Sequence, residues 1–197
     1  MISAHTSTFT DPGRHSQQVF RAAMRALAEP CKPISLAANI TPPDGLTAAA
    51  AAVLLTLADF ETSLWLDAAA SGRPEIGGYL RFHTGTKLTT QASDASFALI
   101  TLAGRMPKLH DFAQGVPEYP DRSTTLIVET AAFNAREWTC SGPGIAGTRT
   151  FGVKGMPSDF LSLWAHNASG FPLGVDILFV AGGQIAGLPR TTRLCEA

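Results

Sequence analysis

The sequence is poor in charged residues, and the two signs almost balance. Charged residues make up 16% of the 197 positions, and 15 Lys and Arg stand against 16 Asp and Glu, a formal net charge of −1. A nucleic-acid-binding domain needs a clustered basic excess to displace counterions from phosphates, so this composition argues against that class. Soluble domains average about 25% charged residues. The deficit predicts that other protein covers a large part of the surface.

Cysteines and long apolar runs are also scarce. Cys31, Cys140 and Cys195 are far apart and form no C-x-x-C pair, which indicates thiols of a reducing compartment rather than a disulfide framework or a zinc site. No apolar run reaches the roughly 20 residues that span a bilayer. Residues 1–16 lack the apolar segment of a secretory signal. We therefore expect a cytoplasmic protein with no membrane partner.

The motifs of several enzyme classes are missing. There is no G-x-S-x-G nucleophile elbow, and the five histidines lack the H-x-H or H-x-x-x-H spacing of a metal site. Residues 142–147 match G-x-G-x-x-G, but the β-branched, glycine-broken stretch that follows is not helical, so they predict a turn rather than a dinucleotide site. Lys154 is flexible enough to consider as a Schiff-base lysine, although an ordinary loop lysine is the simpler interpretation. The sequence predicts no catalytic residue, metal or cofactor.

Helical and strand-like segments alternate along the chain. Apolar residues at helical spacing predict an amphipathic helix between Asp11 and Pro30: Phe20, Ala23, Met24 and Leu27. Further helices are predicted at 42–59, 74–82, 107–114 and 157–167, and strands at 63–67, 97–102, 124–131, 136–141, 175–181 and 184–188. Two glycines between the last two strands predict a hairpin. The pattern predicts one α/β domain over 1–197, with a mixed sheet between helices and loose order at 1–10.

Three groups of polar residues are candidates for a ligand or partner site. Arg81, His83 and Thr84 place a cation, a titratable ring and a hydroxyl at a predicted helix end. Asp176 lies in an apolar strand, so we predict that an arginine or backbone amides pair with it. The third group offers two guanidiniums and two hydroxyls on one segment that we expect to be exposed: Arg190, Thr191, Thr192 and Arg193. An internal salt bridge or cap is the first interpretation of each group, and a ligand or partner contact is the alternative.

The chain also carries stretches typical of one bacterial family. They are FRAAMRALAEP at 20–30, VLLTLAD at 53–59, LRFHTG at 80–85, GPGI at 142–145, FPLGVDILF at 171–179 and LPRTT at 188–192. On these stretches the chain resembles the H subunit of the bacterial carbon–phosphorus lyase system, the PhnH family. Cys31 departs from the family, which usually has glycine after Glu-Pro. A turn that needs a positive φ there would be strained by cysteine.

The resemblance implies a subunit of a core complex with the G, I and J subunits, with the I subunit as the expected direct partner. Together they would transfer an alkylphosphonate to the ribose of ATP with loss of adenine, as an α-D-ribose 1-methylphosphonate 5-triphosphate synthase. It also implies a three-layer α/β/α fold related to pyridoxal-phosphate-dependent transferases, without the cofactor, and a homodimer when isolated. The missing catalytic motifs favour an assembly subunit without turnover of its own. The alternative is a stand-alone transferase or a degenerate pyridoxal-phosphate enzyme.

Overall fold

A mixed seven-stranded sheet lies at the centre of the protein. We describe the protein from a computed structural model, which covers residues 8–197 but not the side chains of residues 134–136. The strand order is β1-β11-β10-β7-β4-β2-β3. The parallel strands are β2 (Ser63–Leu66), β3 (Lys87–Thr89), β4 (Phe97–Ile100), β7 (Thr125–Glu129) and β10 (Asp176–Ala181). Only β11 (Gln184–Leu188) runs antiparallel to its neighbours, β10 and β1 (Ile34–Ser35).

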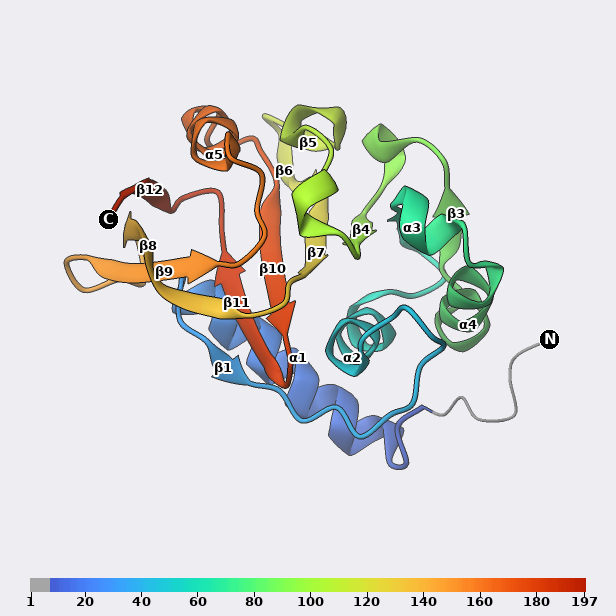
Figure 1. The fold of residues 1–197 in the computed structure, drawn as a ribbon. Coiled ribbons are helices and arrows are strands. Elements are labelled where there is room, and N and C mark those ends of the chain that lie inside the picture. The colour runs from blue at the N-terminus through green and yellow to red at the C-terminus, as the bar shows by residue number, and fades with distance from the viewer. Residues whose placement is uncertain (1–7) are drawn as a thin grey trace.

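Different layers cover the two faces of this sheet (Figure 1). One core joins the sheet to α1 (Pro12–Ala28), α2 (Ala48–Leu57), α3 (Ala68–Ser71) and α4 (Pro74–Thr84). The other joins it to α5 (Phe160–Ser169) and to a second sheet of β12 (Arg193–Glu196), β8 (Phe133–Ser141) and β9 (Arg149–Val153). The α/β class and the mixed sheet are as predicted, but β strands form much of the second covering layer.

The remaining elements are short. β5 (Gln114–Val116) and β6 (Tyr119–Ser123) form a separate hairpin, and the 3-10 turns are η1 (Ala92–Asp94), η2 (Ala103–Arg105) and η3 (Leu109–Asp111). The helix predicted at 107–114 is wrong, because η3 is its only helical part. The Gln114 amide instead donates to the carbonyls of Leu109 and Phe112, both at 2.8 Å, and closes the loop before β5. The expectation of loose order at 1–10 falls mainly on residues 1–7, which lie outside the described residues.

Local chemistry sets the helix ends. The Asp11 carboxylate accepts from the Arg14 amide at 3.1 Å and caps α1. The predicted helix at 42–59 begins later than expected, at Ala48, where the Thr47 hydroxyl accepts from the Ala50 amide at 3.2 Å. Pro42 and Pro43 disfavour helical backbone only at residues 41 and 42, so the Thr47 cap is what sets the first helical residue. Gly85 ends α4 with a left-handed φ of 76°.

The buried face of α1 differs from the predicted one. Phe20 and Met24 are 47% and 39% exposed, whereas Val19, Ala23 and Ala26 are buried. The cause is the close approach of α1 to β11. A Cβ on Gly187 would lie 2.4 Å from the carbonyl oxygen of Ala26, so only small residues fit between helix and strand. Phe20 and Met24 therefore face outward, whereas Leu27 packs against the core as predicted.

The turn predicted at 142–147 is confirmed, because this segment joins the antiparallel strands β8 and β9. Beside it lies Cys31, the only non-glycine residue with positive φ, 59°, in the described chain. Cys31 is buried, and hydrogen bonding with Cys140 and burial raise the pKa of its thiol. The positive φ of Cys31 is the left-handed backbone conformation that was expected to strain a cysteine after Glu-Pro.

We expect Cys31→Gly to be about 1 kcal/mol more stable than Cys31→Ala, because both remove the sulfur but only alanine keeps the left-handed strain. Denaturant unfolding of the two variants measures this difference directly. An alanine variant as stable as the glycine variant would show that the backbone at this turn is unstrained.

Candidate functional site

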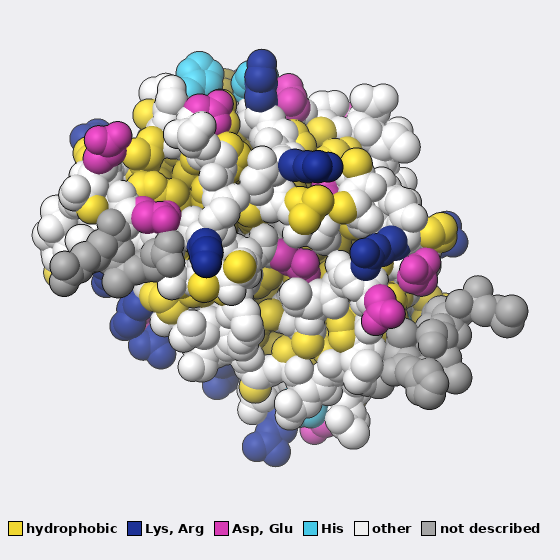
Figure 2. All heavy atoms as spheres, viewed as in Figure 1, with side chains coloured by type: hydrophobic (Ala, Val, Ile, Leu, Met, Phe, Trp, Pro, Cys, Tyr) yellow, Lys and Arg dark blue, Asp and Glu magenta, His cyan; other side chains and the backbone are white. Residues whose placement is uncertain are grey.

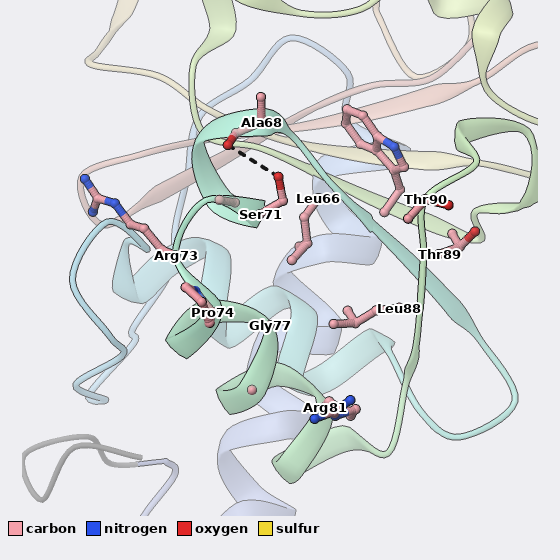
Figure 3. A pocket seen from close by; sticks show the side chains of 13 residues that line it. Leu66, Ala68, Ser71, Arg73, Pro74, Gly77, Arg81, Leu88, Thr89 and Thr90 are labelled. Carbon is pink, nitrogen blue, oxygen red and sulfur yellow. Dashed lines mark hydrogen bonds between the residues drawn. The ribbon is translucent and has the colours of Figure 1, made fainter. Parts of the chain in front are cut away.

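A pocket of about 590 Å³ lies between α4 and the edge strand β3 (Figure 3). Leu66 of β2 and Leu88 of β3 form its apolar wall, opposite Gly77 and Gly78 of α4. A Cβ on Gly77 would lie 2.9 Å from the Leu88 Cδ1, so this glycine lets the helix and the strand approach each other. A Cβ on Gly78 would have nothing within 4 Å, so this second glycine leaves the space open.

Two arginines and several hydroxyls border this apolar pocket. Arg73 immediately precedes α4, and Arg81 lies within it. The hydroxyls come from Ser71, Thr89 and Thr90. Arg73 extends away from Leu88 in Figure 3, and its guanidinium fills the space where a Gly45 Cβ would be. Arg81 is exposed and belongs to no ion pair within the described residues. Arg81 is therefore the guanidinium free to meet an incoming group.

The three residues predicted together at the end of α4 separate in the structure. Arg81 lines the pocket, whereas the Thr84 hydroxyl donates to the Leu80 carbonyl at 2.8 Å and acts within the helix end. The His83 ring lies edge-on to the rings of Tyr79 and Phe82, with centroids 4.8 and 4.9 Å away. Partial desolvation lowers the pKa of His83, which favours the neutral imidazole at neutral pH.

Exposed apolar side chains occur on and beside the elements that form this pocket. Phe82 on α4 is 72% exposed, Phe60 is 67% exposed and Leu88 is 41% exposed. Phe60 lies against Gly85 at the end of α4. β3 pairs only with β2, so its other edge is unpaired among the described strands. We call the residues Phe60, Arg81, Phe82 and Leu88 the α4–β3 surface. Large apolar side chains beside a free arginine and an open strand edge are typical of protein interfaces.

Asp176 is paired as predicted, and both expected partner types contribute. Its carboxylate accepts from the backbone amide of Arg190 at 2.7 Å, from Nε of the same residue at 3.1 Å, and from Nη2. The guanidinium also donates to the Ser123 hydroxyl and to the carbonyls of Pro120 and Pro172. The expected exposure of Arg190 is therefore wrong, since 11% of its side chain is accessible and internal acceptors occupy all its nitrogens.

The two threonines after Arg190 also face inward to different degrees. Thr192 is fully buried, and its carbonyl accepts from the Trp164 indole at 2.8 Å. Its hydroxyl has no hydrogen-bond partner among the described residues. Thr191 is half-buried and Arg193 is exposed on β12. This segment therefore holds α5, β6 and β10 together at the opposite half of the sheet from Arg81.

Two buried carboxyl groups at the carboxyl edge of the sheet were not predicted. Asp67, after β2, accepts from the amides of Ala70 and Thr101, both at 2.8 Å, and from Leu102 at 3.2 Å. It thereby joins α3 to the loop after β4. Glu129, the last residue of β7, accepts from the amide and the hydroxyl of Thr47, both at 2.8 Å. Burial, together with the charge of Asp67, raises the pKa of Glu129 despite these bonds.

We expect the free energy of unfolding of Glu129→Gln, relative to that of wild type, to increase as the pH rises above about 4.5. The folded state holds the Glu129 proton more tightly than the unfolded chain, whose carboxyl has a pKa of about 4.5. Above that pH the unfolded chain releases its proton first, so the wild type loses stability until the folded carboxyl has also ionised. Denaturant unfolding between about pH 4 and pH 8 measures this difference. A difference that does not change with pH would contradict it.

No described helix is both long and apolar enough to cross a membrane. Within the part of the chain that the structure describes, no three His, Cys, Asp or Glu side chains are grouped to hold a metal ion.

Comparison with known proteins gives the family that the sequence stretches indicate, and the match covers nearly the whole chain. Residues 7–195 match the family described as bacterial phosphonate metabolism protein (PhnH). A Rhizobium meliloti (strain 1021) protein named "Alpha-D-ribose 1-methylphosphonate 5-triphosphate synthase subunit PhnH" is 38% identical over 191 residues, 96% of this chain and 95% of that protein. A Stutzerimonas stutzeri protein named "Putative C-P lyase subunit protein HtxG" is 27% identical over 90% of this chain and 85% of its own length. The chain belongs to the PhnH family of bacterial phosphonate metabolism proteins.

Proposed function

We propose that this protein is a subunit of α-D-ribose 1-methylphosphonate 5-triphosphate synthase in the carbon–phosphorus lyase system. The observation that carries the proposal is the 38% identity, over nearly the full length of both chains, to a protein named as that subunit. In this role the protein acts in the cytoplasm with the G, I and J subunits. It supports the transfer of an alkylphosphonate to the ribose of ATP, with release of adenine, and has no turnover of its own.

The α4–β3 surface is the part of the chain that we assign to partner contact, with the I subunit as the direct partner. Aromatic and arginine side chains contribute most of the binding free energy at protein interfaces. Phe82 and Arg81 are adjacent in sequence and both exposed, and Arg81 is in no ion pair among the described residues. Figure 2 shows charged side chains scattered among hydrophobic and neutral ones on one face of the molecule. This distribution suits a protein whose surface is covered in an assembly.

In isolation the same surface would pair with a second copy, because exposed apolar area is unfavourable in water. A two-fold contact is the commonest solution. We expect the fold to be related to that of pyridoxal-phosphate-dependent transferases, as the family resemblance implies, and residues 1–197 to act as one functional unit.

Co-expression with the G, I and J subunits tests the proposal. A tag on this chain should recover all three partners after a high-salt wash, and the isolated chain should release no adenine from ATP and methylphosphonate. Failure to recover the partners would overturn the proposed assembly. Turnover by the isolated chain would instead establish the stand-alone transferase.

A further inference from the structure

A second cavity, of about 740 Å³, opens at the carboxyl ends of β4 and β7. Residues that line the α4–β3 pocket do not line this one. The chain runs from β2 outward to β3 and then returns across β2 to β4, so the strand order reverses between β2 and β4. Open α/β sheets bind ligands outside the carboxyl ends of their strands near such a reversal. The cavity opens at this carboxyl edge and shares β4 with the reversal.

The inner wall of this cavity carries a buried carboxyl group. Glu129 is 8% exposed, and the structure gives it hydrogen bonds at Oε1 only, both from Thr47. Within the described residues no donor is bonded to Oε2. Because Thr47 is the cap of α2, the rigid start of a helix fixes the position of this carboxyl group. Oε2 is not one of the described side-chain oxygens that are both buried and unpartnered, so it is accessible where Glu129 lines the cavity and can accept a hydrogen bond from a ligand.

The rim of the cavity carries two cations. Arg105 belongs to η2 and Lys154 follows β9, and each is next to a glycine. The two loops touch, since a Cβ on Gly104 would lie 3.1 Å from the carbonyl oxygen of Gly155. Neither cation is in an ion pair within the described part of the chain. The lining of this cavity thus includes two free positive charges from contacting loops as well as the carboxyl group of Glu129.

We infer that this cavity binds a small organic phosphate or phosphonate, with the phosphoryl group at Arg105 and Lys154 and a neutral hydroxyl or amine at Glu129. Two cations suit a doubly charged anion, and an arginine can bind two of its oxygens at once. The volume is that of sites for small organic molecules. The choice of a phosphoryl group over another anion rests on the proposed function. The cavity and its charges do not depend on it.

Lys154 is then a binding residue and not a Schiff-base lysine. Its amide donates to the Ala132 carbonyl at 3.0 Å, and its carbonyl accepts from the Thr130 hydroxyl at 2.8 Å. These bonds fix its backbone while the side chain stays exposed at the rim. The positive charge of the Lys154 side chain would then contact the phosphoryl group of the ligand.

Calorimetric titration of the full chain with hydroxymethylphosphonate, methylphosphonate and inorganic phosphate tests the inference. We expect hydroxymethylphosphonate, the organic probe with a neutral hydroxyl for Glu129, to bind at least tenfold more tightly than inorganic phosphate. Arg105→Ala and Lys154→Ala should each weaken that binding at least tenfold, whereas Lys108→Ala, a lysine outside the cavity lining, should leave it unchanged. Thermal unfolding of each variant confirms that the fold is intact.

Glu129→Gln adds a second arm, because glutamine can still accept from Thr47 but cannot ionise. It should shift the preference among the organic probes more than it changes binding of inorganic phosphate. The inference is overturned if no organic probe binds more tightly than inorganic phosphate. It is also overturned if Lys108→Ala weakens binding as much as Lys154→Ala. The readout is binding by the isolated chain, so it is separate from the recovery of partner subunits that tests the proposed function.

Discussion

Arg190→Ala should lower the free energy of unfolding by about 2–4 kcal/mol, because it breaks a largely buried ion pair and leaves several hydrogen-bonding groups without a partner. The Asp176 carboxylate would lose both guanidinium contacts, and the Ser123 hydroxyl would lose its donor. The Pro120 and Pro172 carbonyls would lose theirs as well. In a domain of this size the melting temperature should fall by roughly 4–16 °C.

Arg193→Ala is the matched control. It removes the same side chain three positions away, where the arginine is exposed on β12. Surface substitutions of this kind change stability by about 0.5 kcal/mol or less. Equal melting temperatures for Arg190→Ala and wild type would mean that the ion pair does not support the fold. Asp176→Ala combined with Arg190→Ala should cost less than the sum of the two single variants, because each single variant already breaks the same contact.

Phe82→Ala should weaken binding to the partner subunits about thirtyfold, which corresponds to about 2 kcal/mol for an aromatic side chain at the centre of an interface. The 72% exposure of Phe82 means that its truncation should leave the fold intact. Affinity is measured by titrating this chain into the immobilised G, I and J assembly. Arg81→Ala should weaken binding in the same assay and make it less sensitive to salt.

Phe20→Ala on α1 provides the comparison, since Phe20 is also an exposed phenylalanine, at 47%. If the α4–β3 surface is the interface, this variant binds like wild type. Loss of binding with Phe20→Ala and not with Phe82→Ala would move the interface to α1. The arginines of that helix, Arg14, Arg21 and Arg25, would then be the next residues to test.

The long apolar elements were predictable from the sequence because their patterns are local. The strands at β2, β4, β7 and β10 and the β10–β11 hairpin follow from short apolar runs and a glycine pair. β1 and β3 were missed because they have two and three residues, which is too short for a periodicity. The outward position of Phe20 depends on the contact between Ala26 and Gly187, which are far apart in sequence.

The candidate sites were predictable only where one residue signals its own environment. A carboxylate in an apolar strand indicated a paired Asp176, and the structure supplied Arg190. Glu129 carried the same signal inside the strand predicted at 124–131, but its partner Thr47 lies 82 positions earlier and could not be inferred from local sequence. The pocket beside Arg81 likewise depends on Gly77 and Leu88 meeting across two elements. Such contacts arise from topology and not from local sequence.

The measurement that tests the proposed function most directly is adenine release from ATP and methylphosphonate by the G, I and J subunits, with and without this chain. We expect adenine release to depend on adding the chain, to saturate at a fixed ratio of this chain to its partners, and to fall with Phe82→Ala in proportion to lost binding. Equal adenine release with and without the chain would contradict its assignment as a subunit of the synthase.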